Sequence, residues 1–455
     1  MLQKSNTQKN ILLKTPFYDS IYNMKKLSYC ILVWIIISFV NPLRAQLSSS
    51  NRLHDKYILS EVVVLSRHNI RSPLTGSGSV IERITPYKWY SWSSRPSNLS
   101  QKGGIMETIM GQYFSKWLVN EGLFQEDAVP STDEIRVYAN SMQRTLATAH
   151  YFMSGFMPVA NVSVEHHCNI GVMDSIFTPQ ITYLDDEFCN TAFREIAEMT
   201  GEQIEMHKAS TGVYYCVLEN THKKLANNYA LLYRVLDMQN SPACKYGDSC
   251  GFAEVDTIWL KLYREPATTG SLNMARMASD ALILQYYEER DSTKAAFAHD
   301  LTPKEWLQLS GIKQWYDSIL FTVPSIARQI ATPLLNEIAK ELDTPGRKFS
   351  FLCGHDSNIG SVLTALGVTD YNLPNTIETK TPVGAKLVFE KWMNPQGEYY
   401  ISVNMIFHST NQIRQGRYEP CENEPIIFPI QFNSISANAD GLYSFIDFMK
   451  ILTKK

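Results

Sequence analysis

The sequence ILSEVVVL, residues 58–65, runs directly into SRHNIRSP, residues 66–73. The first part is rich in β-branched residues, which is typical of a buried strand. Positive charge at the end of a buried strand is costly to desolvate unless an anion balances it. Two arginines can bind phosphate oxygens through paired hydrogen bonds, and a histidine between them can attack phosphorus. A loop of solvated charges explains this spacing less well, so we expect a phosphate site at Arg67, His68 and Arg71.

The pattern Arg-His-x-x-Arg-x-Pro resembles the signature of the histidine acid phosphatases. That family usually has Gly after the histidine, whereas this chain has Asn69, as the glucose-1-phosphatases of the family do. Asn tolerates a positive φ better than other non-Gly residues, so we expect the turn to survive. Further stretches resemble the periplasmic glucose-1-phosphatases in order along the chain: residues 78–80, 85–89, 102–104, 138–145, 241–244, 284–288 and 354–358.

The resemblance implies an α/β fold, a phosphoglycerate mutase-like α/β sandwich core with an inserted, mostly helical cap domain. The apolar spacing from about Phe188 to Trp315 is helical, with few strand signals, and this marks the insertion. We therefore expect an α/β catalytic domain over residues 46–187 and 320–455 and a helical cap domain over residues 188–319.

Hydrophobic spacing predicts the other elements of the core. Helices are expected over residues 101–119, 323–342, 357–366 and 442–452, and another begins with Ser141 as its N-cap. Strands are expected over residues 135–139, 348–353, 385–392 and 399–407, the last two as an antiparallel pair joined through residues 394–397. Residues 74–92 are rich in Gly, Ser, Pro and aromatics and are expected to form a long loop.

The N-terminal segment is expected to be a leader and not part of the fold. Residues 27–40 are almost wholly apolar, follow Lys25 and Lys26, and precede a small residue, Ala45. This pattern is typical of a secretory signal peptide, and the apolar run is short for a bilayer span. We expect residues 1–45 to be an extension plus signal peptide, with Met24 as a candidate start, and the mature protein to be periplasmic or secreted and free of the membrane.

Export would allow disulfides. The chain has eight cysteines, and Cys30 lies in the predicted leader, so an odd number remains. We expect Cys244 and Cys250 to pair across their short loop and Cys353 to be a buried free thiol. Zinc is disfavoured because neither a Cys-x-x-Cys nor a His-x-x-x-His pattern occurs. The net charge of −3 has no basic excess that would indicate a nucleic-acid partner.

Charged side chains follow three of the predicted strands: Arg67, His68 and Arg71, then Arg144, then His355 and Asp356. Ligands of open α/β sheets bind at the carboxyl ends of parallel strands, so we expect the three groups to share one pocket. Helix N-termini there would add partial positive charge. Alone, Arg144 could be a surface arginine, His355 a core histidine and Asp356 a helix cap. Together they supply what one phosphate site requires.

The resemblance also implies a mechanism. His68 attacks phosphorus, Asp356 gives a proton to the departing alcohol, and water activated by that carboxylate hydrolyses the phosphohistidine. Phosphoryl oxygens are held by the other charged groups: Arg67, Arg71, Arg144 and His355. Neither a metal nor another cofactor is expected, because the arginines supply the positive charge. An acidic pH optimum is expected, since the arginines lower the pKa of His68 and bound phosphate raises that of Asp356.

The expected substrate is a small phosphomonoester. Glucose-1-phosphatases of the family place a glutamate over the site in a Glu-Pro-x-x-x-Gly-x-Leu context, which here is Glu265 with Pro266, Gly270 and Leu272. Glu265 could accept hydrogen bonds from sugar hydroxyls and would disfavour a highly anionic substrate, or it could be a solvated surface residue. Glucose-1-phosphate is the expected substrate, and phytate is the alternative, because related phytases use the same catalytic set.

Two other classes of protein compete with this interpretation. A phosphoglycerate mutase-like transferase shares the Arg-His motif, but it usually has a glutamate as its general acid and is located in the cytosol. A non-catalytic anion-binding protein would lack the nucleophile or the acid, whereas both His68 and Asp356 are present. The sequence does not predict the oligomeric state.

Overall fold

The computed structural model describes residues 53–74, 78–160, 162–247, 250–416 and 424–454. The described residues from Ile58 onward form one compact unit, which is separate from the segment up to Tyr57. The predicted signal peptide, Met24 and Cys30 lie outside the described residues.

A central sheet carries the predicted motif at the end of its first strand. Its strand order is β11-β10-β9-β1-β8-β2-β3, and β12 (Tyr443–Ser444) pairs with β10. β1 (Ile58–Arg67), β8 (Phe349–Gly354), β2 (Ile135–Ala139) and β3 (Val164–Glu165) are parallel neighbours. β9 (Lys386–Met393), β10 (Tyr399–Phe407) and β11 (Ile426–Pro429) continue the sheet antiparallel on the other side of β1. The predicted α/β core and its terminal hairpin are therefore confirmed.

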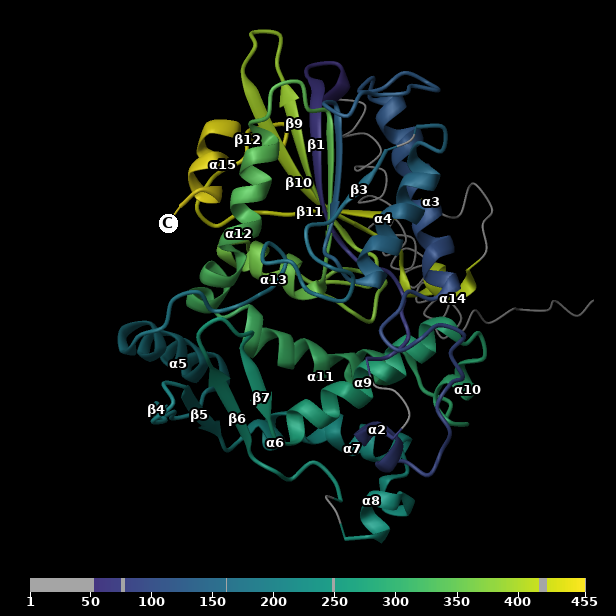
Figure 1. Ribbon diagram of the computed structural model, residues 1–455, viewed down its shortest axis with the longest axis vertical. Helices are drawn as coiled ribbons and strands as arrows, with labels where there is room; N and C mark the ends of the chain where they lie inside the picture. Colours follow the sequence, from purple (N-terminus) through teal and green to yellow (C-terminus); the bar gives the residue numbers. More distant parts are fainter. Residues whose placement is uncertain (1–52, 75–77, 161, 248–249, 417–423, 455) are drawn as a thin grey trace, which may run out of the picture. The chain divides into compact units, whose positions relative to one another are not determined.

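Helices cover both faces of this sheet (Figure 1). On one face lie α3 (Gln101–Asn120) and α4 (Gln143–Phe156), where Phe114 and Phe152 pack on each other and Phe152 stacks on Phe351 of β8. On the other face lie α12 (Pro324–Leu342), α13 (Asp356–Ala365) and α15 (Phe445–Leu452), which share a buried cluster with Leu352 and other strand residues. Because side chains alternate along a strand, β8 serves both layers and its end is held rigidly.

The chain between β3 and α12 forms a mixed helical and strand region that lies below the central sheet in Figure 1. Its longer helices are α5 (Asp186–Thr200), α7 (Ala226–Val235), α9 (Ser271–Glu288) and α11 (Pro303–Phe321). Its short helices are α6 (Thr221–Lys224), η1 (Met238–Asn240), α8 (Pro242–Lys245) and α10 (Ser292–Ala295). The predicted limits of this region as a domain, residues 188 and 319, stay a prediction.

The same region contains a four-stranded antiparallel sheet that the sequence analysis missed. Its strands, in spatial order, are β4 (His207–Lys208), β5 (Tyr214–Leu218), β6 (Asp256–Leu260) and β7 (Ala267–Thr269). Each has at most five residues, which is too short for hydrophobic alternation to be distinguished from a helical pattern. The insertion is mostly helical, as expected, but the expectation of few strands was wrong.

Local differences from the predicted elements have simple causes. Helix α4 has Met142 and not Ser141 at its N-cap, so Arg144 is its second residue. The predicted loop over residues 74–92 contains a short helix, α2 (Val80–Arg83), and α14 (Thr410–Gln415) was not expected. The final helix begins at Phe445, because Tyr443 and Ser444 pair with β10 as β12.

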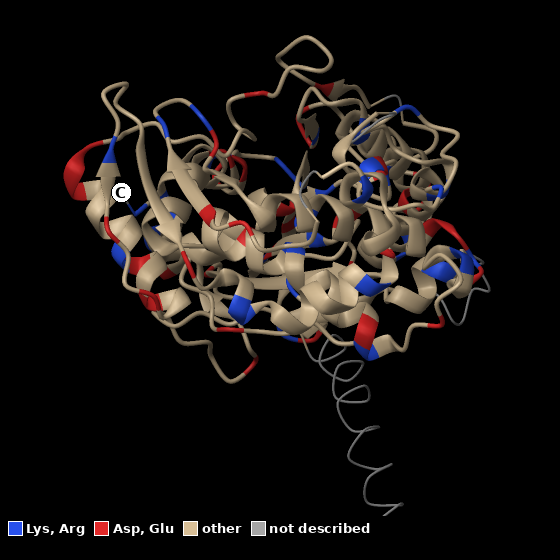
Figure 2. Ribbon diagram, turned by 90° about the horizontal axis from the view of Figure 1, so that it is seen from below, with Lys and Arg blue, Asp and Glu red and all other residues tan. Residues whose placement is uncertain are grey.

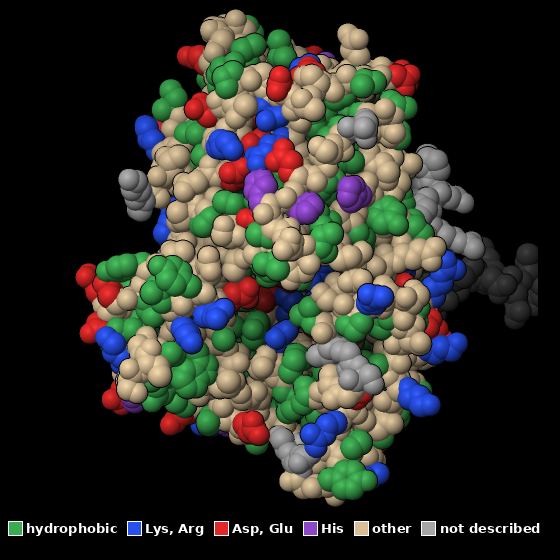
Figure 3. Space-filling model, in the orientation of Figure 1, with side chains coloured by type: hydrophobic (Ala, Val, Ile, Leu, Met, Phe, Trp, Pro, Cys, Tyr) green, Lys and Arg blue, Asp and Glu red, His purple; other side chains and the backbone are tan. Residues whose placement is uncertain are grey.

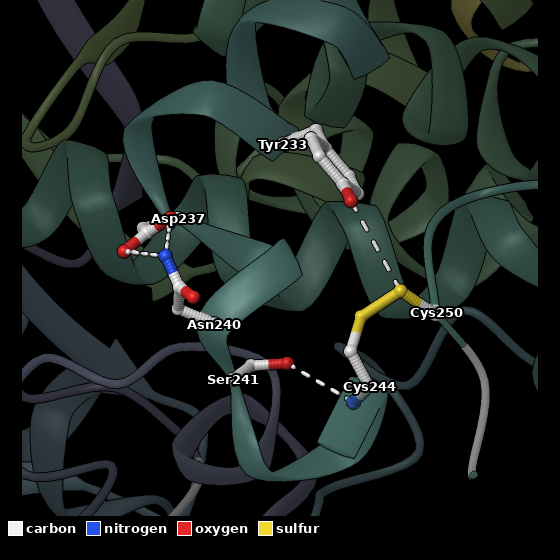
Figure 4. The surroundings of a disulfide bond; sticks show 6 residues. All are labelled: Tyr233, Asp237, Asn240, Ser241, Cys244 and Cys250. Carbon is white, nitrogen blue, oxygen red and sulfur yellow. Dashed lines mark hydrogen bonds between the residues drawn. A yellow bond between two sulfur atoms is a disulfide. The ribbon is translucent and has the colours of Figure 1, made fainter.

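The predicted disulfide between Cys244 and Cys250 is present (Figure 4). Ser241 Oγ accepts a hydrogen bond from the Cys244 amide and begins α8, and Tyr233 Oη lies 4.0 Å from Cys250 Sγ. The link therefore joins a capped helical turn to the chain that follows it. Cys353 is free and buried, as predicted.

In the part of the chain that the structure describes, no helix combines the length and the apolar character needed to cross a bilayer. Along the ribbon in Figure 2, Lys and Arg residues alternate with Asp and Glu residues over the described parts of the chain.

Candidate active site

The structure brings six of the seven predicted site residues together at the carboxyl ends of β1, β8 and β2. Arg67 pairs in register with Gly354, and Ala139 with Cys353, so the three strands end at one level. The loop after β1 supplies His68 and Arg71, and the first turn of α4 supplies Arg144. His355 and Asp356 follow β8 directly. Figure 3 shows a recess between the upper and lower parts of the molecule in which charged side chains gather.

His68 is held as a neutral imidazole. Its Nδ1 lies 2.8 Å from its neighbour's carbonyl oxygen, that of Asn69, and an Nδ1–H that donates there leaves the lone pair on Nε2. Burial lowers the pKa of His68 well below its ordinary value, and the nearby charges of Arg144, His355, Arg71 and Arg67 lower it further. The direction expected from the arginines is confirmed, with burial as the larger cause. A neutral Nε2 can act as a nucleophile.

Asn69 fixes the turn through its side chain and not through its backbone. Its Nδ2 donates to Glu107 Oε1 at 2.7 Å, and its Oδ1 accepts from the Ile70 amide. Glu107 is itself buried against Lys386 at 2.8 Å. The turn forms with Asn at this position, and it does so without the positive φ that we considered, because Asn69 is not among the described residues with positive φ. Its amide group links the His68 loop to α3 and β9.

The three arginines are buried, and each keeps one donor free. Arg67 pairs with Glu378 at 2.7 Å, Arg71 pairs with Asp280 at 3.0 Å, and Arg144 donates to Ser97 Oγ at 2.7 Å. The Nε atoms of all three have no hydrogen-bond partner among the residues that the structure describes. Unsatisfied buried donors are costly, and an anion between the arginines would satisfy them.

The pKa values of Arg144 and Arg67 are shifted in opposite directions. Burial lowers the pKa of Arg144 to about 10, and the neighbouring Arg71 adds to this effect. It acts in the same direction on Arg67, but Glu378 and Asp356 outweigh it and hold the pKa of Arg67 above its ordinary value. Arg144 is therefore the arginine whose charge is least compensated by protein carboxylates, and a bound anion would stabilise it most.

His355 is positioned as a neutral hydrogen-bond donor. The Asn140 side chain is oriented by its Oδ1, which accepts from the Asp174 amide, so its Nδ2 donates to His355 Nε2 at 2.7 Å. The proton of the neutral ring therefore lies on Nδ1, which is 3.5 Å from Arg144 Nη2. Burial and then the Arg144 charge lower the pKa of His355 well below its ordinary value. An uncharged N–H thus points towards the arginine cluster.

Asp356 is the second residue after β8 and the first of α13. His355 takes the N-cap position, so the simple capping role considered for Asp356 does not apply. Its Oδ2 lies 2.6 Å from Lys313 Nζ and 3.3 Å from Arg67 Nη2. Burial acts to raise the pKa of Asp356, but Lys313 and Arg67 outweigh it and hold the pKa well below its ordinary value. The empty site therefore contains Asp356 as a carboxylate.

Glu265 lies apart from the other six residues. Its side chain is exposed and lines a cavity of about 830 Å³ together with Trp259, Lys261 and Gln180. None of the other six predicted residues lines that cavity, although the charges of Arg144 and Asp356 reach Glu265. Glu265 thus lies outside the cluster of the other six residues but within reach of their charges.

Sequence reasoning missed four groups that complete the site: Asn140, Asp280, Lys313 and Glu378. Only Asn140 had a local signal, because it directly follows the strand before Arg144. Asp280 and Lys313 come from helices α9 and α11, and Glu378 comes from the loop before β9. Charged residues on long helices usually face solvent, so their sequence context gave no reason to select them.

Known proteins resemble this chain over most of its length. The family model of the histidine phosphatase superfamily (branch 2) matches residues 58–407. A glucose-1-phosphatase from Salmonella typhimurium is 36% identical over 363 residues, which are 79% of this chain and 83% of that protein. A glucose-1-phosphatase from Providencia rettgeri is 32% identical over 420 residues, 91% of this chain and 95% of that protein.

Among solved structures, the apo form of Hafnia alvei phytase has the same fold, with a TM-score of 0.77. It is 24% identical, and the match covers 88% of this chain and 97% of that one. The residues matched by the family model include the motif after β1 and the His-Asp pair after β8. The chain belongs to the histidine phosphatase superfamily, branch 2.

Proposed function

We propose that this chain hydrolyses small phosphomonoesters through a phosphohistidine on His68, with a sugar phosphate such as glucose-1-phosphate as substrate. One observation carries the proposal: three buried arginines, each with an unpartnered Nε, surround a buried neutral histidine. A dianionic phosphoryl group fits this arrangement in charge and in hydrogen bonding.

In the first half of the reaction, His68 Nε2 forms a bond to phosphorus while the bond from phosphorus to the alcohol oxygen breaks. Asp356 gives its proton to that oxygen, and the alcohol leaves. In the second half, Asp356 takes a proton from water, the water oxygen bonds to phosphorus, and the bond to Nε2 breaks. Asp356 is then protonated again, and phosphate is released.

The remaining residues stabilise charge on the transferring phosphoryl group. Arg67, Arg71 and Arg144 are placed to bind its oxygens, and the neutral Nδ1–H of His355 adds a donor. Asp280 and Glu378 hold two of the arginine side chains in position before the substrate arrives. Such preorganisation reduces the cost of ordering these groups during the reaction. No metal is required in this scheme, since the arginines supply the positive charge.

The leaving group is proposed to be an uncharged alcohol of sugar size. Two relatives with 36% and 32% identity are named glucose-1-phosphatase, and both matches span most of the chain. Glu265, which lines the neighbouring cavity, could accept hydrogen bonds from sugar hydroxyls and would repel the further phosphates of phytate. Phytate is therefore the competing substrate. The N-terminal pattern of a signal peptide supports a periplasmic or secreted location.

The direct test is release of phosphate from p-nitrophenyl phosphate in the presence of a chelator, with glucose-1-phosphate and phytate as competing substrates. Activity that persists with the chelator, and stronger competition by glucose-1-phosphate, is the expected result. Stronger competition by phytate would replace the sugar phosphate with the alternative. Phosphate release that depends on added metal, or that is absent, would contradict the proposed chemistry.

A further inference from the structure

Helix α11 places two charged side chains behind the proposed acid. Lys313 Nζ lies 2.6 Å from Asp356 Oδ2 and 2.5 Å from Asp317 Oδ2, so one ammonium group bridges two carboxylates. Lys313 and Asp317 are four residues apart, on one face of the helix. The mechanism proposed above uses neither of them.

These residues line a second cavity, of about 200 Å³, between α11, α13 and the loop before β9. Asp356 lines it as well, whereas His68, Glu265 and the other predicted site residues do not. A cavity of this size holds several water molecules. Asp356 therefore lies between the phosphate-binding groups and a separate space that contains polar side chains.

This position matters because Asp356 must change its charge in each reaction cycle. In the empty site it is a carboxylate between Lys313 and Arg67, yet it must carry a proton when the ester bond breaks. The phosphate-binding side is almost fully buried, with His68 4% exposed, whereas the Asp356 side chain is 20% exposed. A proton that travels by the cavity would not have to pass the bound substrate.

We propose that Asp317 and water in this cavity form a proton relay that loads Asp356, while Lys313 holds the two carboxyl groups in place. Lys313 stays an ammonium, because burial acts to lower its pKa but the charges of Asp317 and Asp356 outweigh burial and hold the pKa above the ordinary value. The O–H bond of a protonated Asp317 breaks as an O–H bond forms on a cavity water, and another O–H bond of that water breaks as an O–H bond forms on Asp356. The water is unchanged at the end, Asp317 has become a carboxylate, and Asp356 has become the acid. Hydronium in the cavity then restores the proton on Asp317.

The surroundings of Asp317 suit this task. Burial raises the pKa of Asp317 to about 6, the nearby Asp356 charge adds to this, and Lys313 and Arg67 oppose it. Asp317 thus exchanges protons with water in mildly acidic solution, where Asp356 in the empty site does not. A bound phosphoryl anion would engage Arg67 and raise the pKa of Asp356, which makes the transfer from Asp317 favourable.

The relay depends on the proposed function and is tested by the leaving group. Asp317→Asn keeps the size of the side chain but cannot supply a proton. Turnover of glucose-1-phosphate, whose alcohol needs a proton, should fall by about tenfold or more. Turnover of p-nitrophenyl phosphate should stay within about twofold, because nitrophenolate leaves without a proton. Asp370→Asn is the matched control, since Asp370 lines the same cavity but pairs with Lys380 and should leave both rates unchanged.

A rescue experiment separates a relay from a purely structural role. In Asp317→Ala, added acetic acid can enter the vacated space and donate in place of the carboxyl group. Glucose-1-phosphate turnover should then rise with acid concentration at fixed pH, and Lys313→Met should show no rescue. Equal loss for both substrates in Asp317→Asn, or no rescue in Asp317→Ala, would overturn the relay while an active wild-type enzyme keeps the proposed function. An inactive wild type would overturn both.

Discussion

His68 owes its neutral state more to burial than to the arginines beside it. A solvated histidine at the same place would be partly protonated in acid and could not attack phosphorus. Its Nδ1 bond to the Asn69 carbonyl also points Nε2 away from its own loop. The local motif therefore sets both the charge and the direction of the nucleophile.

His68→Ala should abolish turnover, because no other group is placed to form the covalent bond. Brief exposure to labelled substrate followed by denaturation should trap phosphate on the wild-type protein and not on this variant. His150→Ala, at an exposed position on α4, is the matched control and should trap phosphate normally. Labelling of the His68 variant at the wild-type level would remove His68 from the mechanism.

Asp356→Asn should slow hydrolysis of sugar phosphates by about a hundredfold or more, the usual contribution of a general acid. Aryl phosphates should lose less, because their leaving groups are stable as anions. The measurement is kcat for a series of esters with alcohols of different acidity. A uniform loss across the series would mean that Asp356 acts by charge or position and not as a proton donor.

Glu265→Gln should weaken turnover of glucose-1-phosphate and hardly change that of simple aryl phosphates, because Glu265 lines a neighbouring cavity that the three arginines do not line. Turnover of inositol phosphates should hold or rise once the repulsive charge is gone. Glu254→Gln, an exposed glutamate in the same region, is the matched control. Equal losses on all substrates would assign Glu265 a structural role.

At the residue scale, the sequence predicted those site residues that belong to a short motif or directly follow a predicted strand. Arg67, His68 and Arg71 share one motif, and His355 with Asp356 follows an evident strand. Lys313 was not predicted, because a lysine within an amphipathic helix has no local feature that separates it from a solvated one. Only the packing of α11 near the start of α13 gives Lys313 its partner.

At the scale of elements, α3 and α4 form a closely packed pair that positions Arg144. A Cβ atom at Gly155 would lie 1.9 Å from the Thr108 carbonyl oxygen, and one at Gly111 would lie 2.1 Å from that of Phe152. The two helix backbones therefore approach each other where only glycine fits. Arg144 lies in the first turn of α4, so the distance between the helices also sets its position.

Gly155→Ala should lower the free energy of unfolding by about 1–3 kcal/mol, the usual cost of overpacking, despite the better helix propensity of alanine. Urea denaturation would measure it. Gly311→Ala is the matched control in α11, where the added methyl group meets only the Asn228 side chain at 3.2 Å. That control should be neutral or stabilising. An unchanged midpoint in Gly155→Ala would show that the helices can separate without cost.

Element prediction succeeded where the hydrophobic pattern was long and failed where it was short. Helix α12 and the β9–β10 hairpin match the predicted ranges to within about one residue at each end. The sheet formed by β4 to β7 escaped detection because each strand is too brief to show a period. β4 pairs with β5 and β6 with β7 locally, but the pairing of β5 with β6 joins distant segments, which no local window contains.

At the scale of the whole molecule, the inserted region contributes charge to a site whose phosphate-binding groups come from the sheet. Helices α9 and α11 supply Asp280 and Lys313, which pair with Arg71 and Asp356. The sheet side therefore carries excess positive charge, and the insertion supplies partners both for an arginine and for the proposed acid. The sequence could not predict that the insertion supplies these charged partners, because their positions depend on how two helices lie against the strand ends.

The combined charges predict how the rate depends on pH. The lowered pKa of His68 keeps the nucleophile neutral well below the pH at which a free histidine takes up a proton, so the acidic limb lies at low pH. On the alkaline side, Asp317 loses its proton as pH rises through about 6, so loading of Asp356 fails there if the relay operates. The profile of kcat/KM should be bell-shaped, with an optimum on the acidic side of neutral.

Phosphate monoesters also lose their second proton near pH 6, at about the same pH as Asp317. Ionisation of the substrate affects the pH profiles of wild type and Asp317→Asn equally, so a comparison of the two proteins on one substrate cancels its effect. The wild-type alkaline limb should be absent or displaced in the variant, while the acidic limb, which reports His68, should coincide in the two proteins. Identical alkaline limbs would assign that limb to the substrate alone, and a rate that rises steadily to alkaline pH would contradict a neutral histidine nucleophile with a carboxylic acid partner.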